Sequence, residues 1–147
     1  MTIKSLFIIL LPFTFAVACN KKKSNSVPSR MAFALNGDTI WTTTNVRTDN
    51  PQNGNIFITG TTSDGQKSMS IGLTGYTGTK KTFLVDYRGP GGNMTGNTGM
   101  YKDCTTGTVA RTGKIVITEV NGDILRGYFD LRFLQEDMKG TFLTSSK

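Results

Sequence analysis

Short apolar runs separated by turn dipeptides fill the sequence after residue 30 and restrict its fold more than any other feature. The turn dipeptides are Asn36-Gly37, Asn53-Gly54, Asp64-Gly65 and Asn121-Gly122. Asn-Gly and Asp-Gly accept the positive φ angles that tight hairpin turns require. The runs lie at 31–35, 39–46, 55–61, 67–73, 82–87, 100–102, 114–120, 124–133 and 139–143. Because no window has an apolar stripe at helical spacing, the sequence predicts an all-β domain.

Alternation within the runs assigns side chains to the two faces of each strand. In the run 124–133, the residues predicted to face the core are Leu125, Gly127, Phe129, Leu131 and Phe133. Those predicted to face outward are Arg126, Tyr128, Asp130 and Arg132. Strands with one apolar and one polar face are typical of antiparallel sheets that share a core. We expect an antiparallel β-sandwich of about eight or nine strands, with a small lipocalin-like β-barrel as the alternative.

The register of the hairpin around Asn121-Gly122 depends on which side chains must be buried. A two-residue turn at Asn121-Gly122 would pair Ile117 with the polar Arg126. A three-residue loop that includes Val120 would pair Ile117 with Leu125 and leave Gly122 in a left-handed bulge position. Since register follows the face that must be buried, the sequence favours the three-residue loop.

The first 18 residues have the pattern of a secretory signal. Lys4 supplies a positive charge, residues 6–17 are almost wholly apolar, and the small residues Ala16 and Ala18 precede Cys19. A helix needs ~20 apolar residues to cross a bilayer core, so this run is too short to remain as a membrane span. We expect residues 1–18 to be removed.

The cleavage region Ala16-Val17-Ala18-Cys19 resembles the lipobox of bacterial lipoproteins. The resemblance implies cleavage between Ala18 and Cys19 and attachment of diacylglycerol to the Cys19 sulfur, so that the lipid bilayer is a partner. Two or three acyl chains together hold a protein firmly on a membrane. An ordinary secretory cut that leaves a free thiol is the alternative. The expected location is the outer membrane, and the sequence leaves both the periplasmic and the cell-surface orientation open.

Residues 19–29 have the composition of a disordered tether. Lys21, Lys22 and Lys23 are followed by small polar residues and Pro28, with little to bury. The lysines either rest on anionic lipid headgroups or are simply solvated. Residues 30–147 contain only a small excess of Lys and Arg over Asp and Glu. A nucleic-acid-binding domain would need basic residues clustered on one face, so we expect no nucleic-acid partner.

Residues 30–147 are expected to form a single domain, and two features of it are similar to a known group. One is the segment FALNGDTIW at 33–41, and the other is the pair of motifs Gly127-Tyr128-Phe129 and Gly140-Thr141-Phe142. Together with the lipobox cysteine, they resemble a small uncharacterised lipoprotein family of Bacteroidota. The resemblance implies a lipid-anchored envelope protein and brings no established activity with it.

Residues that could perform catalysis are scarce. The chain contains no histidine, so Ser-His-Asp and Cys-His nucleophile systems and histidine-containing zinc sites are excluded. Asp103 next to Cys104 is expected to disfavour a reactive thiolate, while counting alone allows a Cys19–Cys104 disulfide. A pair of carboxylates that meets across strands leaves a hydrolase as a remote alternative. We expect no enzyme, no metal site and no cofactor.

Aromatic and basic side chains supply the candidate ligand-binding residues. Tyr128 is the aromatic residue most expected to be exposed, between Arg126 and Arg132 on the same strand face, and Trp41 is either a binding platform or a core residue. We expect residues 88–99 to form one long connection, and such connections are suited to carrying a binding surface. The sequence thus predicts a non-catalytic structural or interaction domain of the cell envelope with an unknown envelope protein or external ligand as its partner. A module for carbohydrate, peptide or a small apolar ligand is the alternative.

Overall fold

The computed structural model describes residues 27–49, 54–88 and 96–145, and within these ranges the chain forms strands and no helix. The strands in chain order are β1 (Arg30–Leu35), β2 (Ile40–Thr43), β3 (Val46–Asp49), β4 (Ile56–Thr61), β5 (Lys67–Leu73), β6 (Lys81–Asp86), β7 (Thr98–Asp103), β8 (Thr106–Val109), β9 (Thr112–Asn121), β10 (Ile124–Arg132) and β11 (Asp137–Ser145). The all-β prediction is confirmed.

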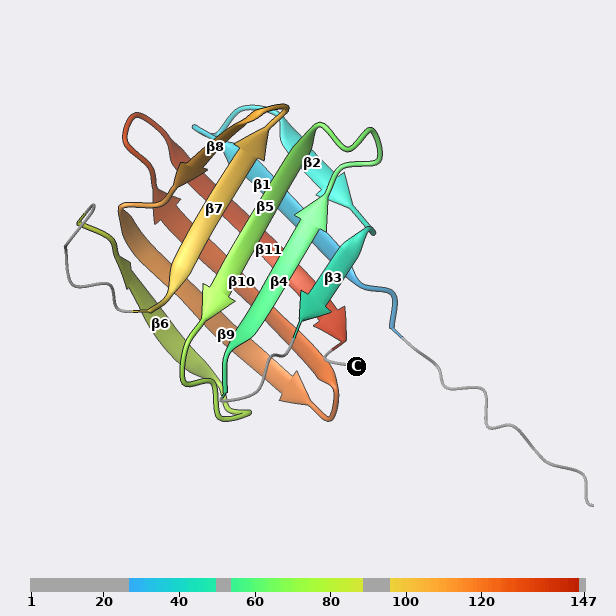
Figure 1. Ribbon diagram of the computed structural model, residues 1–147. Helices are drawn as coiled ribbons and strands as arrows, with labels where there is room; N and C mark the ends of the chain where they lie inside the picture. The colour runs from blue at the N-terminus through green and yellow to red at the C-terminus, as the bar shows by residue number, and fades with distance from the viewer. Residues whose placement is uncertain (1–26, 50–53, 89–95, 146–147) are drawn as a thin grey trace, which may run out of the picture.

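The strands form two antiparallel sheets that pack face to face. The six-stranded sheet has the order β2-β1-β11-β10-β9-β6, and the five-stranded sheet has the order β3-β4-β5-β7-β8. In Figure 1 the five-stranded sheet lies in front of the six-stranded one. The sheets do not close into a barrel, so the sandwich prediction is confirmed and the barrel alternative is set aside.

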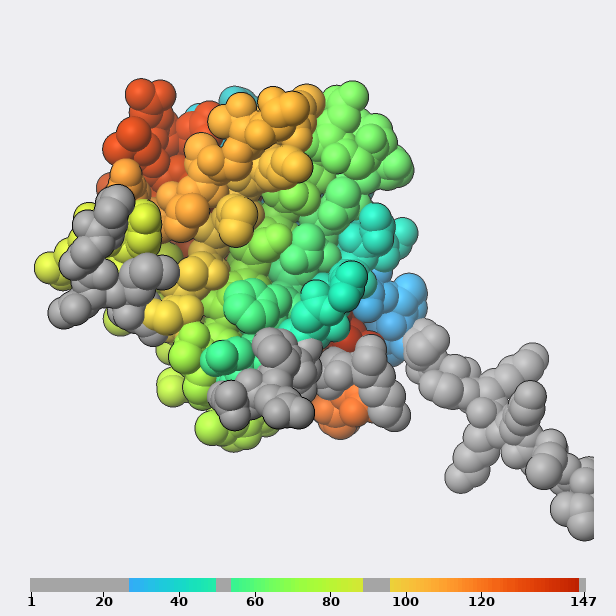
Figure 2. Space-filling view, viewed as in Figure 1, coloured from blue at the N-terminus to red at the C-terminus, as the bar shows by residue number. Residues whose placement is uncertain are grey.

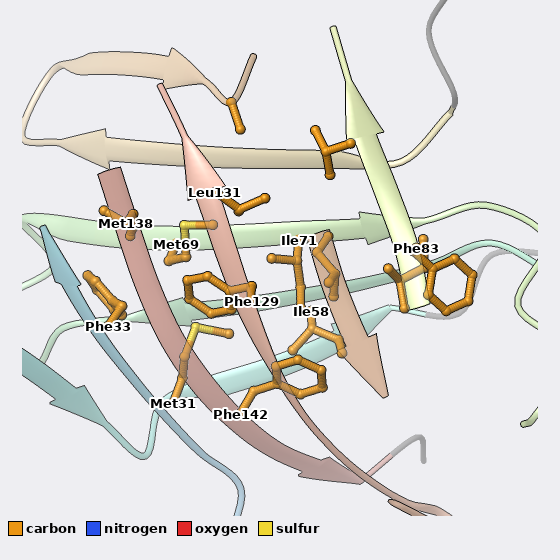
Figure 3. Close-up of a cluster of buried hydrophobic side chains, with 14 of the residues drawn as sticks. Met31, Phe33, Ile58, Met69, Ile71, Phe83, Phe129, Leu131, Met138 and Phe142 are labelled. Carbon is orange, nitrogen blue, oxygen red and sulfur yellow. The ribbon is translucent and has the colours of Figure 1, made fainter. Parts of the chain in front are cut away.

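Apolar side chains from both sheets meet in one core. Figure 3 shows Met31, Phe129 and Phe142 of the six-stranded sheet close to Ile58, Met69 and Ile71 of the five-stranded sheet. The burial of β10 follows the predicted alternation: Leu125, Gly127, Phe129 and Leu131 are buried, whereas Arg126, Tyr128 and Arg132 are exposed. Fully burying one such apolar side chain stabilises the fold by ~1.5–3 kcal/mol.

The two Gly-x-Phe motifs pair with each other across β10 and β11. Gly127 is opposite Phe142, and Gly140 is opposite Phe129. A Cβ atom at Gly127 would lie 2.5 Å from Cζ of Phe142, and one at Gly140 would lie 2.3 Å from Cζ of Phe129. Each ring thus covers the glycine across from it, an arrangement that fixes strand register. The middle residues of the motifs, Tyr128 and Thr141, are paired on the outer face of the sheet.

The prediction of one strand at 39–46 was wrong, because the chain changes sheets within it. Strand β2 pairs with β1 in one sheet, and β3 pairs with β4 in the other. The buried Thr43 holds this corner: its hydroxyl donates to the Thr61 carbonyl at 2.5 Å and accepts from the Asn45 N–H at 2.9 Å. A side chain that satisfies local backbone groups in this way offers an alternative to continuing the strand.

Strand β8 was not predicted, because Thr106–Val109 contains no inward apolar side chain and all four residues are exposed. The strand exists through its pairing with β7 along the edge of the five-stranded sheet. This strand and the division of 39–46 raise the expected eight or nine strands to the eleven found in the described ranges.

The predicted register of the β9–β10 hairpin was also wrong. Ile124 pairs with Asn121 and Leu125 with Val120, so the turn is a two-residue one at Gly122 and Asp123. A bulge then shifts the register between Arg126 and Gly127, so that Ile117 pairs with Gly127. The shift keeps both Val120 and Ile117 on the core side, because without it the side chain of Ile117 would point outward. Ile117 is buried, as the sequence analysis required, but a bulge achieves this and not a three-residue loop.

Three earlier predictions fall wholly or partly outside the described residues. They are the signal with its cleavage between Ala18 and Cys19, the tether up to residue 26, and positions 89–95 of the connection between β6 and β7. The end of that connection was misplaced, because Thr98 and Gly99 belong to β7.

Candidate functional site

A cleft of about 830 Å³ lies on the outer face of the six-stranded sheet. Its lining comes from β1, β2, β10 and β11, with contributions from Asn45 and Ser63 at the corner between the sheets and from Thr118 at the bulge of β9. The volume is in the range of small-molecule binding sites, which is ~300–1,000 Å³.

The centre of the cleft is a row of outward side chains that crosses four neighbouring strands. Thr42 of β2 pairs with Ala32 of β1, Ala32 pairs with Thr141 of β11, and Thr141 pairs with Tyr128 of β10. Tyr128 retains 38% of its accessible surface. The small Ala32 leaves a depression between Thr42 and Thr141, so the row offers one aromatic ring and three hydroxyl groups on one surface.

A second row beside this one consists of two arginines that flank a covered leucine. Leu143 of β11 faces outward and is opposite both Arg30 of β1 and Arg126 of β10, yet it is only 5% exposed. The aliphatic stems of the arginines lie on either side of Leu143, where they can cover it while the guanidinium groups stay in water. Since neighbouring strands are ~4.8 Å apart, the two arginine backbones are ~10 Å apart.

The charges of the two arginines are only partly neutralised. Arg126 has a single contact with Glu119 of β9, 3.2 Å between Nη1 and Oε2, and both side chains are well exposed. Arg30 has no ion pair with any described residue. Among the described residues that line the cleft there is no Asp or Glu. The described lining of the cleft therefore carries a positive charge, and its described residues leave guanidinium donors available to a ligand.

A second, shallower hollow of about 530 Å³ continues from the cleft along the same face. It shares Ala32, Tyr128 and Thr141 with the cleft, and Ile40 of β2, which is 67% exposed, borders it. Lys139 and Asp130 lie at this hollow with 3.5 Å between Nζ and Oδ2. Tyr128 thus lies between the cleft, which contains the two arginines, and the hollow, whose lining is mixed and more apolar.

The structure brings together two of the four predicted ligand-binding residues. Tyr128 and Arg126 both line the cleft. Arg132 is on the same face of β10 but outside the cleft, with its Nε 3.0 Å from Oδ1 of Asp137. Trp41 is on the other side of the six-stranded sheet, half-buried, with its ring centroid 5.8 Å from that of Phe33. Of the two interpretations of Trp41, the core position is the correct one.

Sequence reasoning missed Arg30, Thr141 and Leu143. Arg30 precedes the predicted strand at 31–35, whereas in the structure it begins β1 and lies on the same face as Ala32. Thr141 and Leu143 could have been found by aligning the two Gly-x-Phe motifs, because that alignment puts Thr141 beside Tyr128 and Leu143 beside Arg126.

A second cluster of polar side chains lies at the far end of the five-stranded sheet. Lys67 Nζ is 2.5 Å from Oδ2 of Asp103 and 5.1 Å from the Trp41 ring centroid, and the Tyr101 hydroxyl donates to the same carboxylate oxygen. The hydrogen bond with Asp103 raises the pKa of Lys67, and the hydrogen bond with Lys67 lowers the pKa of Asp103. Both groups are thereby held in their charged forms, which opposes a role for Lys67 as a base.

Cys104 is free and exposed in the turn next to this cluster. Its φ angle is +51°, and its thiol is 3.4 Å from Oδ1 of Asp103. The interaction with Asp103 raises the pKa of the Cys104 thiol, in the direction that the sequence predicted. Because the thiolate is the reactive form, this environment makes Cys104 a poor nucleophile at neutral pH.

The described residues contain no group of three or more His, Cys, Asp or Glu side chains that could hold a metal ion. Within the same ranges, no helix is long and apolar enough to cross a membrane. Comparisons of the chain with protein-family models, curated proteins and solved structures found no match.

Proposed function

We propose that this chain is a lipid-anchored protein of the bacterial cell envelope whose β-sandwich acts by binding a ligand. Cys19 is the anchor, and the cleft around Tyr128 is the binding surface. No catalytic step is part of the proposal.

The observation that supports binding is the cleft itself. It combines an exposed aromatic ring, several hydroxyl groups and two arginines on the outer face of one sheet. A purely structural domain would have no need to keep Arg30 without an ion pair to any described residue, next to a hollow that its small neighbour Ala32 leaves open. We therefore favour a ligand-binding module over a structural domain. The anchor is supported by the lipobox-like segment Ala16-Val17-Ala18-Cys19 alone.

Cell fractionation tests the anchor. The parent chain is expected in the membrane fraction, and Cys19→Ser is expected to be released as a soluble protein because it has no thiol to acylate. Cys104→Ser is the matched control and should stay with the membrane, since Cys104 lies in the folded domain. Both chains also carry Tyr128→Ala, so that ligand binding by the cleft does not hold them on the membrane. If Cys19→Ser in this background sediments with membranes as completely as its parent, the anchor is disproved.

Two exposed aromatic residues on opposite outer faces test the binding surface. Tyr128 is 38% exposed on the six-stranded sheet, and Phe57 is 44% exposed on the five-stranded sheet. The Cys19→Ser chain, free of its anchor, is incubated with isolated cell envelopes, and the bound fraction is measured by sedimentation. Tyr128→Ala should lower binding by about tenfold, the size expected when one stacking or packing contact is removed, and Phe57→Ala should not. Equal loss in both variants, or loss only with Phe57→Ala, would refute this assignment.

A further inference from the structure

We infer that the cleft takes an acidic oligosaccharide and holds a carboxylate of it between Arg30 and Arg126. This inference rests on the proposed function, because it names the ligand class of the same cleft. It also assigns Arg30, Thr141 and Glu119 roles that go beyond the Tyr128–Arg126 pair.

Charge is the first argument. Two guanidinium groups flank Leu143, and none of the described lining residues is acidic. Arginine forms bidentate, charge-assisted hydrogen bonds with carboxylates, which are about twice as strong as bonds between neutral groups. A ligand without negative charge would leave Arg30 without a partner in the described part of the site. The complementary ligand is therefore an anion.

The uncharged lining is the second argument. Besides Tyr128, the cleft presents the polar side chains of Thr42, Thr141 and Asn45. A sugar ring has hydroxyl groups that bond to such side chains and a C–H face that packs on an aromatic ring. Purely apolar ligands would leave these polar groups without partners when they displace water, which is costly.

The position of the cleft within the sheet is the third argument and disfavours a peptide. Extended peptides are commonly bound by adding a strand at a sheet edge, where backbone groups are free. Strands β1, β11 and β10 each have a neighbour on both sides, so their backbone groups are already paired. Over these three strands, which carry Tyr128 and both arginines, the ligand must be recognised by side chains, as suits a carbohydrate.

The test uses matched probes that differ in charge. Oligogalacturonate is compared with its methyl ester, and sialyllactose with lactose, by calorimetric titration of the full chain in detergent. A Glu-rich peptide is the probe for the competing ligand class. We expect at least one acidic saccharide to bind, its neutral counterpart to bind at least tenfold more weakly, and affinity to fall as salt is raised.

Variants on the same sheet face then identify the residues. Arg126→Gln and Arg30→Gln should each weaken binding of the acidic saccharide by about tenfold or more, the size of a lost charge-assisted hydrogen bond. Arg132→Gln is the matched control, because Arg132 is on the same face of β10 but pairs with Asp137 outside the cleft, and it should bind as the parent does. Glu119→Gln removes the carboxylate that competes for Arg126 and should tighten binding by about twofold.

The outcomes separate this inference from the proposed function. If neither acidic saccharide binds at millimolar concentration, or the neutral probes bind equally well, or Arg126→Gln binds unchanged, the acidic-saccharide assignment is wrong. If only the Glu-rich peptide binds with the same arginine dependence, the ligand is an acidic peptide and the assignment is also wrong. In all these cases the proposed function still stands if Tyr128→Ala, and not Phe57→Ala, lowers binding to cell envelopes by about tenfold.

Discussion

The two outer faces of the sandwich differ in how their arginines are paired. On the five-stranded sheet, Arg47 of β3 is paired with Asp49 of the same strand, with 2.8 Å between Nε and Oδ1. Threonine and serine side chains bond with each other nearby, as between Thr59 and Ser70 at 2.9 Å. Figure 2 looks directly onto this face. On the six-stranded sheet, by contrast, Arg30 is left without an acidic partner among the described residues, beside a cleft.

This difference indicates which surface is available to a ligand. Side chains whose hydrogen bonds and charges are satisfied within their own sheet gain little from a partner, whereas an unpaired guanidinium in a hollow gains a full charge-assisted bond.

The largest effect on stability is expected from Gly127→Ala, a substitution on the core side of the strand that carries Arg126 and Tyr128. A Cβ atom there would lie 2.2 Å from the Val116 carbonyl oxygen as well as against the Phe142 ring. Because a backbone atom cannot easily move away, we expect the free energy of unfolding to fall by about 3 kcal/mol. Gly107→Ala in β8 meets nothing within 4 Å and should leave stability unchanged or slightly higher. Denaturation in urea measures both, and equal losses would contradict the account of the Gly-x-Phe pair.

A smaller loss is expected from Leu143→Ala, which removes the apolar floor between the arginines. Leu143 is 5% exposed although it faces outward, so its truncation should cost about 2 kcal/mol, the lower end for a buried leucine. Met100 on the other outer face is 48% exposed, and Met100→Ala should cost less than ~0.5 kcal/mol. If the two variants unfold at the same urea concentration, the arginine stems do not cover Leu143.

The ion pair between Lys67 and Asp103 should make the stability of the domain depend on pH. Asp103 has a lowered pKa because of its hydrogen bond with Lys67, so its contribution to stability is complete above its ordinary pKa of 3.8 and disappears as pH falls through the lower folded value. Asp103→Asn should therefore lower Tm at pH 7, and the difference from the parent should shrink below pH 3.8. A difference that grows on acidification would have the wrong sign.

The smallest effect concerns the reactivity of Cys104. The Asp103 carboxylate raises the pKa of this thiol, so Asp103→Asn should lower that pKa and speed alkylation by iodoacetamide near neutral pH. The Cys19→Ser background leaves Cys104 as the one thiol in the chain. Asp64→Asn, in the neighbouring turn, is the control. It should change the alkylation rate less, because the charge of Asp64 raises the pKa of Cys104 less than Asp103 does. An unchanged rate in Asp103→Asn would remove the electrostatic explanation.

Much of the fold was predictable because strands with one buried face impose a period of two on the sequence. The faces of β5 and β10 follow from that period directly, as Met69 and Leu125 illustrate. Strand β8 escaped prediction because an exposed edge strand has no apolar face to reveal it. The corner at Thr43 and the bulge at Thr118 could not be predicted, because they depend on contacts with residues of other strands. Thr43 bonds to Thr61, and Thr118 bonds to Arg126.

The candidate site was only half predictable for a related reason. Tyr128 and Arg126 are neighbours on one strand, so alternation alone places them on the same face. Arg30 is 96 positions from Arg126 in sequence and joins it only because β1 and β10 both pair with β11. Trp41 could not be assigned from sequence, since an alternating strand allows an aromatic residue on either face until the partner strand is known.

Protection of arginine side chains during binding would test the central claim most directly. The Cys19→Ser chain is treated with phenylglyoxal in the presence and absence of isolated cell envelopes, and modification of each arginine is read by mass spectrometry. The account predicts that bound envelopes protect Arg30 and Arg126, while Arg132 and Arg47, which lie outside the cleft with 72% and 78% of their side-chain surface exposed, remain as reactive as in the free chain. Protection of Arg47 with continued reaction at Arg30 and Arg126 would place the ligand on the opposite face and contradict it.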